Sequence, residues 1–296
     1  MHPDPNVRNW IRCHKAWVGK DTGIHKLGSA DFWNRAWKKR ILGQAANTDS
    51  NLGRGLKRTE AVIGLLEEAG FRPGSARVLD IGCGPGALSL PLARAGARVT
   101  SLDISSAALG CLVSEAEREG LSIEPVECSW WTADVERLGF RNRFDLVIAS
   151  MTPSIKDVAT FDRMAACSRN LCYYGGFLPG GRDRALQDIC KNIIGPDFSR
   201  QRKERPLFLY YFMYLYLNGY RPVVRIHHHR QRKEVNWEEA ADKAIRCIDR
   251  AEILPDETKR KIRDYFQNSA IEGKYPVRSD GYTGMMVWDV NRTQES

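Results

Sequence analysis

An apolar segment that runs directly into a glycine-rich turn constrains this chain more than any other feature. Residues 78–86 read Val-Leu-Asp-Ile-Gly-Cys-Gly-Pro-Gly, and Asp103 lies near the end of the next apolar segment, residues 99–104. Glycine has no Cβ, so the backbone can turn sharply after the first strand and approach a ligand closely. A carboxylate at the tip of the second strand can accept hydrogen bonds from both hydroxyls of a ribose. The pattern predicts a site for a ligand that contains a nucleoside.

The glycine spacing alone leaves two kinds of nucleoside site open. It also resembles the dinucleotide fingerprint, with Ala87 in the place of the last glycine. The segments that follow distinguish the two: the strand at 99–103 is followed by Phe144-Asp-Leu-Val-Ile-Ala-Ser150, and Gly284-Met-Met-Val-Trp288 lies near the end of the chain. In this order they resemble the class I S-adenosylmethionine-dependent methyltransferases, and dehydrogenases do not usually show the set.

This resemblance, which is strongest over residues 56–177, implies a Rossmann-like α/β fold. The alternation of helical and strand patterns predicts a doubly wound, mostly parallel seven-stranded sheet covered by helices. We expect an N-terminal helical extension or lid over 1–55, the methyltransferase core over 56–234, a helical insertion or cap over 235–275, and the last core strand and tail over 276–296. The main predicted elements are helices at 29–41, 56–69, 87–95, 106–119 and 206–217, and strands at 77–82, 98–104, 122–128, 144–150, 169–177, 220–228 and 285–290.

By this similarity the cofactor is S-adenosylmethionine and the product is S-adenosylhomocysteine. Asp80 and the glycine turn would hold the methionine part, and Asp103 would hold the ribose. The adenine contacts stay open, because relatives often carry an acidic residue after the third strand, where this chain has Cys-Ser-Trp-Trp at 128–131. A serine or a later aspartate could bond the exocyclic amine, and an indole could stack on the base or belong to the core. The predicted cofactor residues are Asp80, Gly82, Cys83, Gly84, Gly86, Asp103, Ile104, Ser129, Trp130, Asp134 and Ser150.

Methyl transfer from a sulfonium is an in-line displacement, so the protein must chiefly align the nucleophile and keep water out. The loop 150–154 follows the fourth strand, where the acceptor usually arrives in this fold, and side-chain alternation should turn one tyrosine of the fifth strand toward it. We predict Thr152 and Tyr173 as catalytic residues, although Thr152 could merely shape its turn. The predicted substrate contacts are Trp33, Trp37, Met151, Pro153 and Tyr174, of which the two tryptophans belong to the lid helix or to the core.

The acceptor class rests on charge and on the loop after the fourth strand. The net charge of +9 invites a phosphate-bearing partner, but each basic cluster is short, which favours a solvated surface. Ser-Met-Thr-Pro at 150–153 replaces the Asn/Asp-Pro-Pro-aromatic motif of enzymes that methylate planar amino groups. We therefore predict a methyltransferase acting on a small molecule. The alternatives are an RNA or protein methyltransferase and a non-catalytic module that binds S-adenosylmethionine.

The remaining features set the cellular context. The eight cysteines are scattered without a Cys-x-x-Cys pair, and the histidines at 227–229 lack a carboxylate or cysteine at ligand spacing, so we predict no metal site. The most apolar run, 207–217, is too short to span a bilayer. The first residues show no secretion signal, so we expect a cytoplasmic monomer or homodimer that does not enter membranes.

Overall fold

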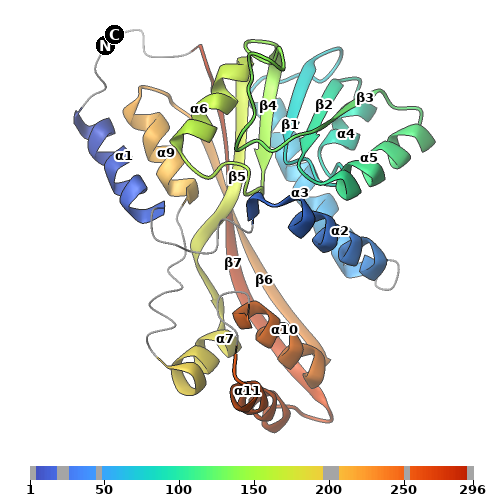
Figure 1. Ribbon diagram of the computed structural model, residues 1–296, viewed down its shortest axis with the longest axis vertical. Helices are drawn as coiled ribbons and strands as arrows, with labels where there is room; N and C mark the ends of the chain where they lie inside the picture. Colours follow the sequence, from blue (N-terminus) through green and yellow to red (C-terminus); the bar gives the residue numbers. More distant parts are fainter. Residues whose placement is uncertain (1–4, 19–26, 45–48, 196–206, 250–253, 292–296) are drawn as a thin grey trace. The chain divides into compact units, whose positions relative to one another are not determined.

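The computed structural model describes residues 5–18, 27–44, 49–195, 207–249 and 254–291 (Figure 1). Seven strands form one sheet in the order β3-β2-β1-β4-β5-β7-β6. The strands are β1 (Arg77–Ile81), β2 (Arg98–Asp103), β3 (Ile123–Glu127), β4 (Phe144–Ser150), β5 (Ser168–Asp183), β6 (Val223–Asn236) and β7 (Lys274–Asp289). The helices are α1 (Pro5–Val18), α2 (Ala30–Gln44), α3 (Asp49–Glu68), α4 (Ser89–Arg94), α5 (Ser106–Arg118), α6 (Val158–Cys167), α7 (Arg184–Ile189), the π-helix η2 (Cys190–Ile194), α9 (Leu207–Leu217), α10 (Trp237–Asp249) and α11 (Asp256–Asn268).

The pairing of the strands confirms the predicted α/β class. β1 pairs in parallel with β2 and with β4, β2 pairs in parallel with β3, and β4 with β5. The Val290 N–H donates to the Asn170 carbonyl at 2.8 Å, so the end of β7 lies beside the start of β5 and the two run antiparallel. After β3 the chain returns to the other side of β1, so the strand order reverses between β1 and β4. Ligands of such sheets bind at the carboxyl ends of the strands beside this reversal.

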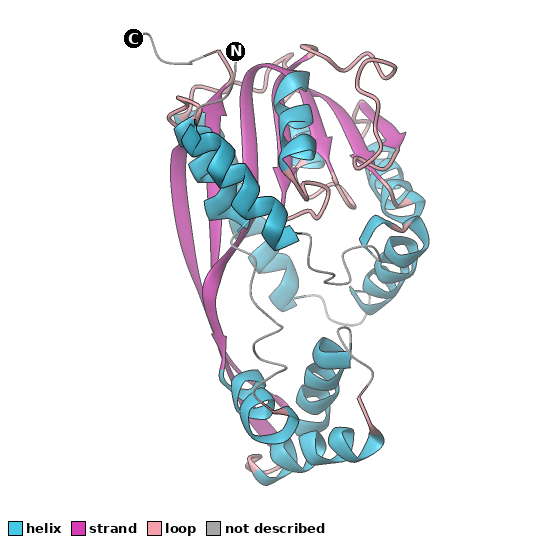
Figure 2. Cartoon of the chain, turned by 60° about the vertical axis from the view of Figure 1, so that its left-hand side comes forward, coloured by secondary structure: helices cyan, strands magenta, loops and turns pink. Residues whose placement is uncertain are grey.

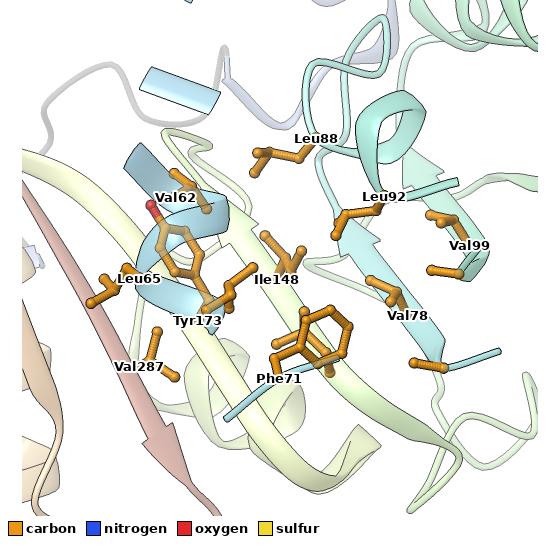
Figure 3. Close-up of a cluster of buried hydrophobic side chains, with 14 of the residues drawn as sticks. Val62, Leu65, Phe71, Val78, Leu88, Leu92, Val99, Ile148, Tyr173 and Val287 are labelled. Atoms are coloured by element: carbon orange, nitrogen blue, oxygen red, sulfur yellow. The ribbon is translucent and has the colours of Figure 1, made fainter. Parts of the chain in front are cut away.

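One face of the sheet is covered by α3, α4 and α5. Val62 and Leu65 of α3 and Leu92 of α4 pack on Val78 and Tyr173 in one buried cluster, which Figure 3 shows. Paired residues of parallel strands point to the same side, so the cluster continues across β1, β4 and β5. Burying each large aliphatic side chain contributes about 1.5–3 kcal/mol relative to leaving it exposed. Helices flank both faces of the sheet (Figure 2).

The opposite face carries an aromatic core between the sheet, α6 and α9. The Phe161 ring of α6 stacks on Tyr211 of α9 at 4.5 Å between centroids and on Trp288 of β7 at 5.2 Å. Phe208 fills the space beside Gly284, where a Cβ would lie 2.5 Å from its ring. The tyrosine-rich helix α9 therefore covers this face of the sheet. Within the described ranges, no helix combines the length and apolar character needed to cross a membrane.

The chain folds into two compact units whose boundaries differ from those we predicted. The first contains residues 1–176, 208–225 and 284–296, and the second contains 177–207 and 226–283. The predicted division kept β5 and β6 in the core and began the insertion at residue 235. The reason for the difference is that β5, β6 and β7 are long enough to contribute residues to both units.

The second unit has its own hydrophobic core. Ile189 from α7, Ala241 and Ile248 from α10, and Ile262 and Phe266 from α11 are buried together. The predicted helical insertion is therefore present in α10 and α11, and α7 and η2 add to it. This unit is held by apolar burial of its own rather than being a loop on the sheet.

Candidate functional site

The turn after β1 adopts a backbone conformation that favours glycine. Gly82 and Gly84 have φ angles of +68° and +56°, in the left-handed region. A Cβ on Gly82 would overlap the Thr152 hydroxyl, and a Cβ on Gly84 would lie 2.9 Å from the Trp37 ring. The Gly82 N–H donates to the Leu102 carbonyl at 2.7 Å, which ties the turn to the end of β2. The turn thus forms a cradle that side chains on these glycines would fill.

Asp103 supplies a fixed carboxylate beside this turn. Its Oδ2 accepts the Gly84 N–H at 2.9 Å and its Oδ1 accepts the Ser105 N–H at 2.8 Å. Burial raises the pKa of Asp103, and the N–H groups of Ser105, Gly84 and Ile104 partly oppose the rise. The two N–H groups hold the carboxylate in a defined orientation. Each of its oxygens can still accept a further hydrogen bond, as the predicted contact with the ribose requires.

Asp80 lies inside the protein at the end of β1, with 3% of its surface exposed. Ser101 Oγ donates to Ser89 Oγ at 2.8 Å, and Ser89 Oγ donates to Asp80 Oδ2 at 2.8 Å. Burial raises the pKa of Asp80 to about 6; the Ser89 hydrogen bond lowers it and the nearby Asp103 carboxylate raises it further. This serine chain fixes the Asp80 carboxylate, and neither serine belongs to a motif that can be recognised in the sequence.

The N-terminal helix α2 contacts the same turn. Asn34 Oδ1 accepts the Ser105 hydroxyl at 2.7 Å and the Ala107 N–H at 3.1 Å, at the start of α5. The Trp37 ring lies against Gly84, and Trp33 Nε1 donates to the Leu27 carbonyl at 2.8 Å. Asn34 was missed in the sequence, where the only signal is an amide between the aromatic residues of a helix. Both predicted tryptophans therefore belong to an element that covers the turn.

The two neighbouring tryptophans after β3 have different surroundings. Trp130 is 2% exposed, and its indole N–H donates to the Thr160 carbonyl at 3.0 Å, so it belongs to the core rather than to an adenine contact. Trp131 is half-buried, donates to the Pro153 carbonyl at 3.1 Å, and packs against Gly28 before α2. The Lys156 ammonium lies 4.3 Å from the Trp131 ring centroid. Of these two tryptophans, Trp131 is therefore the one that lies beside the loop after β4.

The two polar candidates for the adenine contact are not brought into this arrangement. Asp134 is exposed, and its Oδ1 accepts the N–H groups of Glu136 and Arg137, both at 3.1 Å, which caps a turn. Ser129 is half-buried, and its carbonyl accepts the Thr132 N–H at 3.1 Å. Asp134 thus has a structural role, and Ser129 lies two residues before Trp131 in the chain.

The loop after β4 holds a strained and hydrogen-bonded conformation. Met151 has a φ of +53°, which is rare for a residue with a side chain and costs of order 1–3 kcal/mol. Its N–H donates to the Gly175 carbonyl at 2.8 Å. Thr152 Oγ1 donates to Ser154 Oγ at 2.8 Å and accepts the Ser154 N–H at 3.2 Å. The predicted loop residues therefore lie at the reversal of strand order, with Thr152 against Gly82.

The two tyrosines of β5 point to opposite faces of the sheet. Tyr173 is 1% exposed on the α3 side, with its hydroxyl beside Gly175, and burial raises its pKa well above the ordinary value (Figure 3). Its phenol therefore stays protonated near neutral pH, which argues against a role as base. Tyr174 lies in the aromatic core with Phe161 and Phe208. The structure thus corrects the prediction that Tyr174 contacts the substrate, because alternation turns it away from the face that carries Asp80.

Two further sequence features are the cysteine of the glycine turn and the histidines at 227–229. Cys83 is buried in the turn, where burial raises the pKa of its thiol well above the ordinary value. His228 Nε2 lies 3.3 Å from Asp280 Oδ1, and His229 Nε2 lies 2.7 Å from Thr283 Oγ1, within the second unit. Across the described ranges, no group of three or more His, Cys, Asp or Glu side chains is arranged to hold a metal ion.

A family model of the methyltransferase domain matches residues 78–175. This segment is a methyltransferase domain. It contains the glycine turn, Asp103 and the loop after β4, so the resemblance to class I S-adenosylmethionine-dependent methyltransferases is confirmed for the part of the chain that carries the site. The predicted cofactor class is that of this family.

Curated relatives match over a similar length of chain. The ubiquinone biosynthesis O-methyltransferase of Bradyrhizobium diazoefficiens is 32% identical over 126 residues, which are 42% of this chain and 47% of that protein. The protein of the same name from Methylocella silvestris is 35% identical over 125 residues, 41% of this chain and 46% of its own length. The chain therefore spans about half the length of the curated relatives it matches.

A solved structure supports the fold alone. It comes from Anaeromyxobacter dehalogenans, is provisionally described as a type II methyltransferase, and superimposes with a TM-score of 0.50 at 14% identity. The likeness covers 78% of this chain and 96% of that one. The methyltransferase domain thus has the Rossmann-like architecture that the sequence predicts.

Proposed function

We propose that this protein transfers a methyl group from S-adenosylmethionine to a small-molecule acceptor. The observation that carries the proposal is the arrangement at the reversal of strand order. There a turn of left-handed glycines lies beside the oriented carboxylate of Asp103, and Thr152 and Trp37 lie against the same turn. The relatives named as O-methyltransferases support the same reaction class.

The residues present fit this cofactor. The glycine turn allows close approach to the amino-acid part, and Asp103 would accept hydrogen bonds from the ribose hydroxyls. The half-buried indole of Trp131 replaces Trp130 as the aromatic candidate for the adenine. When bound, the cofactor would supply a methyl group on a positively charged sulfonium. The transfer itself needs no negatively charged side chain beside the sulfur, because the positive charge of the sulfonium disappears in the reaction.

On the acceptor side, the chain would act by positioning. The Thr152 hydroxyl, fixed by Ser154, is the group in the loop after β4 that would orient an acceptor atom. Trp37 and Trp131 would exclude water from the turn, with α2 as the lid. Tyr173 would hold its proton, so the acceptor's proton would leave by another route than this phenol.

The acceptor class follows from the relatives and the loop. The matched relatives act as O-methyltransferases in ubiquinone biosynthesis, which supports a hydroxyl-bearing small molecule as acceptor here. RNA is the second candidate, because Lys38, Lys39 and Arg40 are exposed on α2 beside Trp37. A non-catalytic binding module is the third, because the described structure shows no side chain placed as a general base.

Labelled cofactor distinguishes these functions. Full-length protein is incubated with methyl-labelled S-adenosylmethionine and a fractionated cell extract, and label is followed into small molecules, RNA and protein. We expect label in small molecules. Label in RNA that is lost with rising salt would favour the second candidate. Tight cofactor binding without transfer to any fraction would favour the third.

The Thr152→Val variant separates binding from turnover at the same site. It keeps the shape of the side chain but removes the hydroxyl that bonds Ser154, so cofactor affinity should stay within about twofold while turnover falls about tenfold, the size of one lost hydrogen bond. Calorimetry with S-adenosylhomocysteine and the labelling assay measure the two effects. Unchanged turnover would remove Thr152 from the mechanism.

We also propose that the protein works in the cytoplasm as a monomer or homodimer. Four cysteines lie in helices and strands of the first unit and form no disulfide, namely Cys13, Cys111, Cys167 and Cys172. Cell fractionation tests the location, and light scattering of the purified protein tests the assembly state. Recovery from a secreted fraction, or a larger oligomer, would contradict the proposal.

A further inference from the structure

The second unit contains a cavity of 280 Å³. It is bounded by the start of α7, by α10, by the end of α11 and by the first residues of β7. No residue of the glycine turn, of Asp103 or of the loop after β4 lines it. The volume lies near the lower end of the range for small-molecule sites, so the cavity suits a compact ligand.

The inside of the cavity is apolar and partly aromatic. Ala240 and Ala244 are buried on the side of α10, and their small side chains leave the space open. Phe266 packs edge-to-face with Tyr265 at 5.3 Å and with Tyr275 at 4.7 Å between ring centroids. Aromatic rings pack well on one another in edge-to-face and offset geometries, so this wall favours a flat ring.

The two carboxylates that line the cavity are already engaged by the fold. Asp183 Oδ1 accepts the Leu186 N–H at 3.2 Å and caps α7. Asp188 Oδ2 accepts the Tyr265 hydroxyl at 3.1 Å, and burial raises the pKa of Tyr265 so that this donor stays protonated. Neither carboxylate pairs with one of the cations that line the cavity.

Those cations are Arg184, Lys243 and Arg278, one from each of three elements. All three side chains are exposed, and none of them forms an ion pair or a hydrogen bond with another residue of the described ranges. Three positive charges therefore face two engaged negative ones around an apolar interior. We propose that this cavity binds a small aromatic anion, an aryl carboxylate or aryl phosphate, with its ring against Phe266 and its charge toward Lys243 and Arg278.

Cys247 gives a reporter inside the cavity, because this half-buried free thiol lines it. Full-length protein is alkylated with iodoacetamide, and the rate at Cys247 is followed by peptide mass spectrometry with the exposed Cys13 as internal control. Phenyl phosphate and benzoate should each slow labelling of Cys247 in a saturable way and leave Cys13 unchanged. Benzyl alcohol has the ring without the charge, and inorganic phosphate has the charge without the ring, so both should protect at least about tenfold less well.

Charge removal tests the same proposal from the protein side. Lys243→Gln combined with Arg278→Gln should weaken protection by phenyl phosphate about tenfold or more, since charged hydrogen bonds are lost at two exposed positions that the fold does not need. Arg246→Gln, also exposed on α10 but outside the cavity, is the matched control and should leave protection unchanged. No protection by either aryl anion, equal protection by benzyl alcohol or inorganic phosphate, or full protection in the double variant would overturn the proposal. None of these readouts depends on methyl transfer.

Discussion

Asp103→Asn tests the proposed cofactor site with the smallest change in shape. In the native protein two backbone N–H groups, those of Gly84 and Ser105, donate to different oxygens of one carboxylate. Asparagine offers one oxygen and one NH₂ group, so one of these N–H groups would face another donor. Because Asp103 is only 7% exposed, the loss should lower the free energy of unfolding by about 1–3 kcal/mol and leave the protein folded.

The effect on cofactor affinity should be larger than a neutral hydrogen bond explains. A hydrogen bond to a charged group contributes about 1.5–3 kcal/mol and one to a neutral group about 0.5–1.5 kcal/mol. Replacing the charge at two ribose hydroxyl contacts therefore removes about 2–3 kcal/mol. This corresponds to a Kd about 30 to 150 times higher for S-adenosylhomocysteine.

The assay is titration calorimetry with S-adenosylhomocysteine, accompanied by urea unfolding of each protein. Asp264→Asn on α11 is the control, because this exposed aspartate undergoes the same chemical change outside the methyltransferase domain. Its Kd should equal that of the parent protein. If folded Asp103→Asn bound within twofold of the parent, Asp103 would not hold the ribose and the cofactor would have to be placed elsewhere.

Two further predictions concern the residues beside Asp103. The pKa of Asp80 rises from 3.8 to about 6 on folding, so the folded state binds the proton more strongly and stability falls as the pH rises from about 4 to 6, by up to about 3 kcal/mol from this group. Urea unfolding at pH 4.5 and 7 should show this decrease in the parent and a smaller one in Asp80→Asn, since burial also raises the pKa of Asp162 to about 6; an equal decrease in both would contradict the prediction. Gly82→Ala should lower the free energy of unfolding by about 1–2 kcal/mol because of the positive φ, and further because the new Cβ overlaps with Thr152. Gly64→Ala in α3, where a Cβ meets open space, should instead raise the free energy of unfolding by about 0.5–1 kcal/mol. Thermal unfolding measures both, and a neutral Gly82→Ala would refute the close contact.

The parts of the site that the sequence predicts are those set by local chemistry. A strand that ends in alternating glycines can be recognised without knowing its surroundings, and the carboxylate of Asp103 comes at the end of the following strand. The predicted strands 98–104 and 144–150 agree with β2 and β4 to within one residue at each end. In β4, residues 146–149 read Leu-Val-Ile-Ala without a polar residue, because parallel central strands are buried on both faces.

The parts that the sequence does not predict depend on packing between distant segments. Trp130 and Trp131 are adjacent, and only the packing of α6 places the first in the core and the second beside Gly28. The sequence around Asn34 predicts a helix but does not indicate that the start of α5 lies next to this side chain. The polar sequence of β6 also does not predict that the strand extends to Asn236. This part of the strand is held by pairing with β7 and not by a buried apolar face. At its end the Trp237 N–H donates to the Gly273 carbonyl.

The geometry around Gly82 links the two halves of the proposed reaction. The Thr152 hydroxyl lies where a Cβ of Gly82 would be, and the strained Met151 is bonded to β5, so the loop after β4 has little freedom to move away from the turn. A molecule that displaces this loop must also change the space beside the glycine turn. Binding of an acceptor at Thr152 and binding of the cofactor at the turn are therefore expected to depend on each other, because the contact between Thr152 and Gly82 belongs to both.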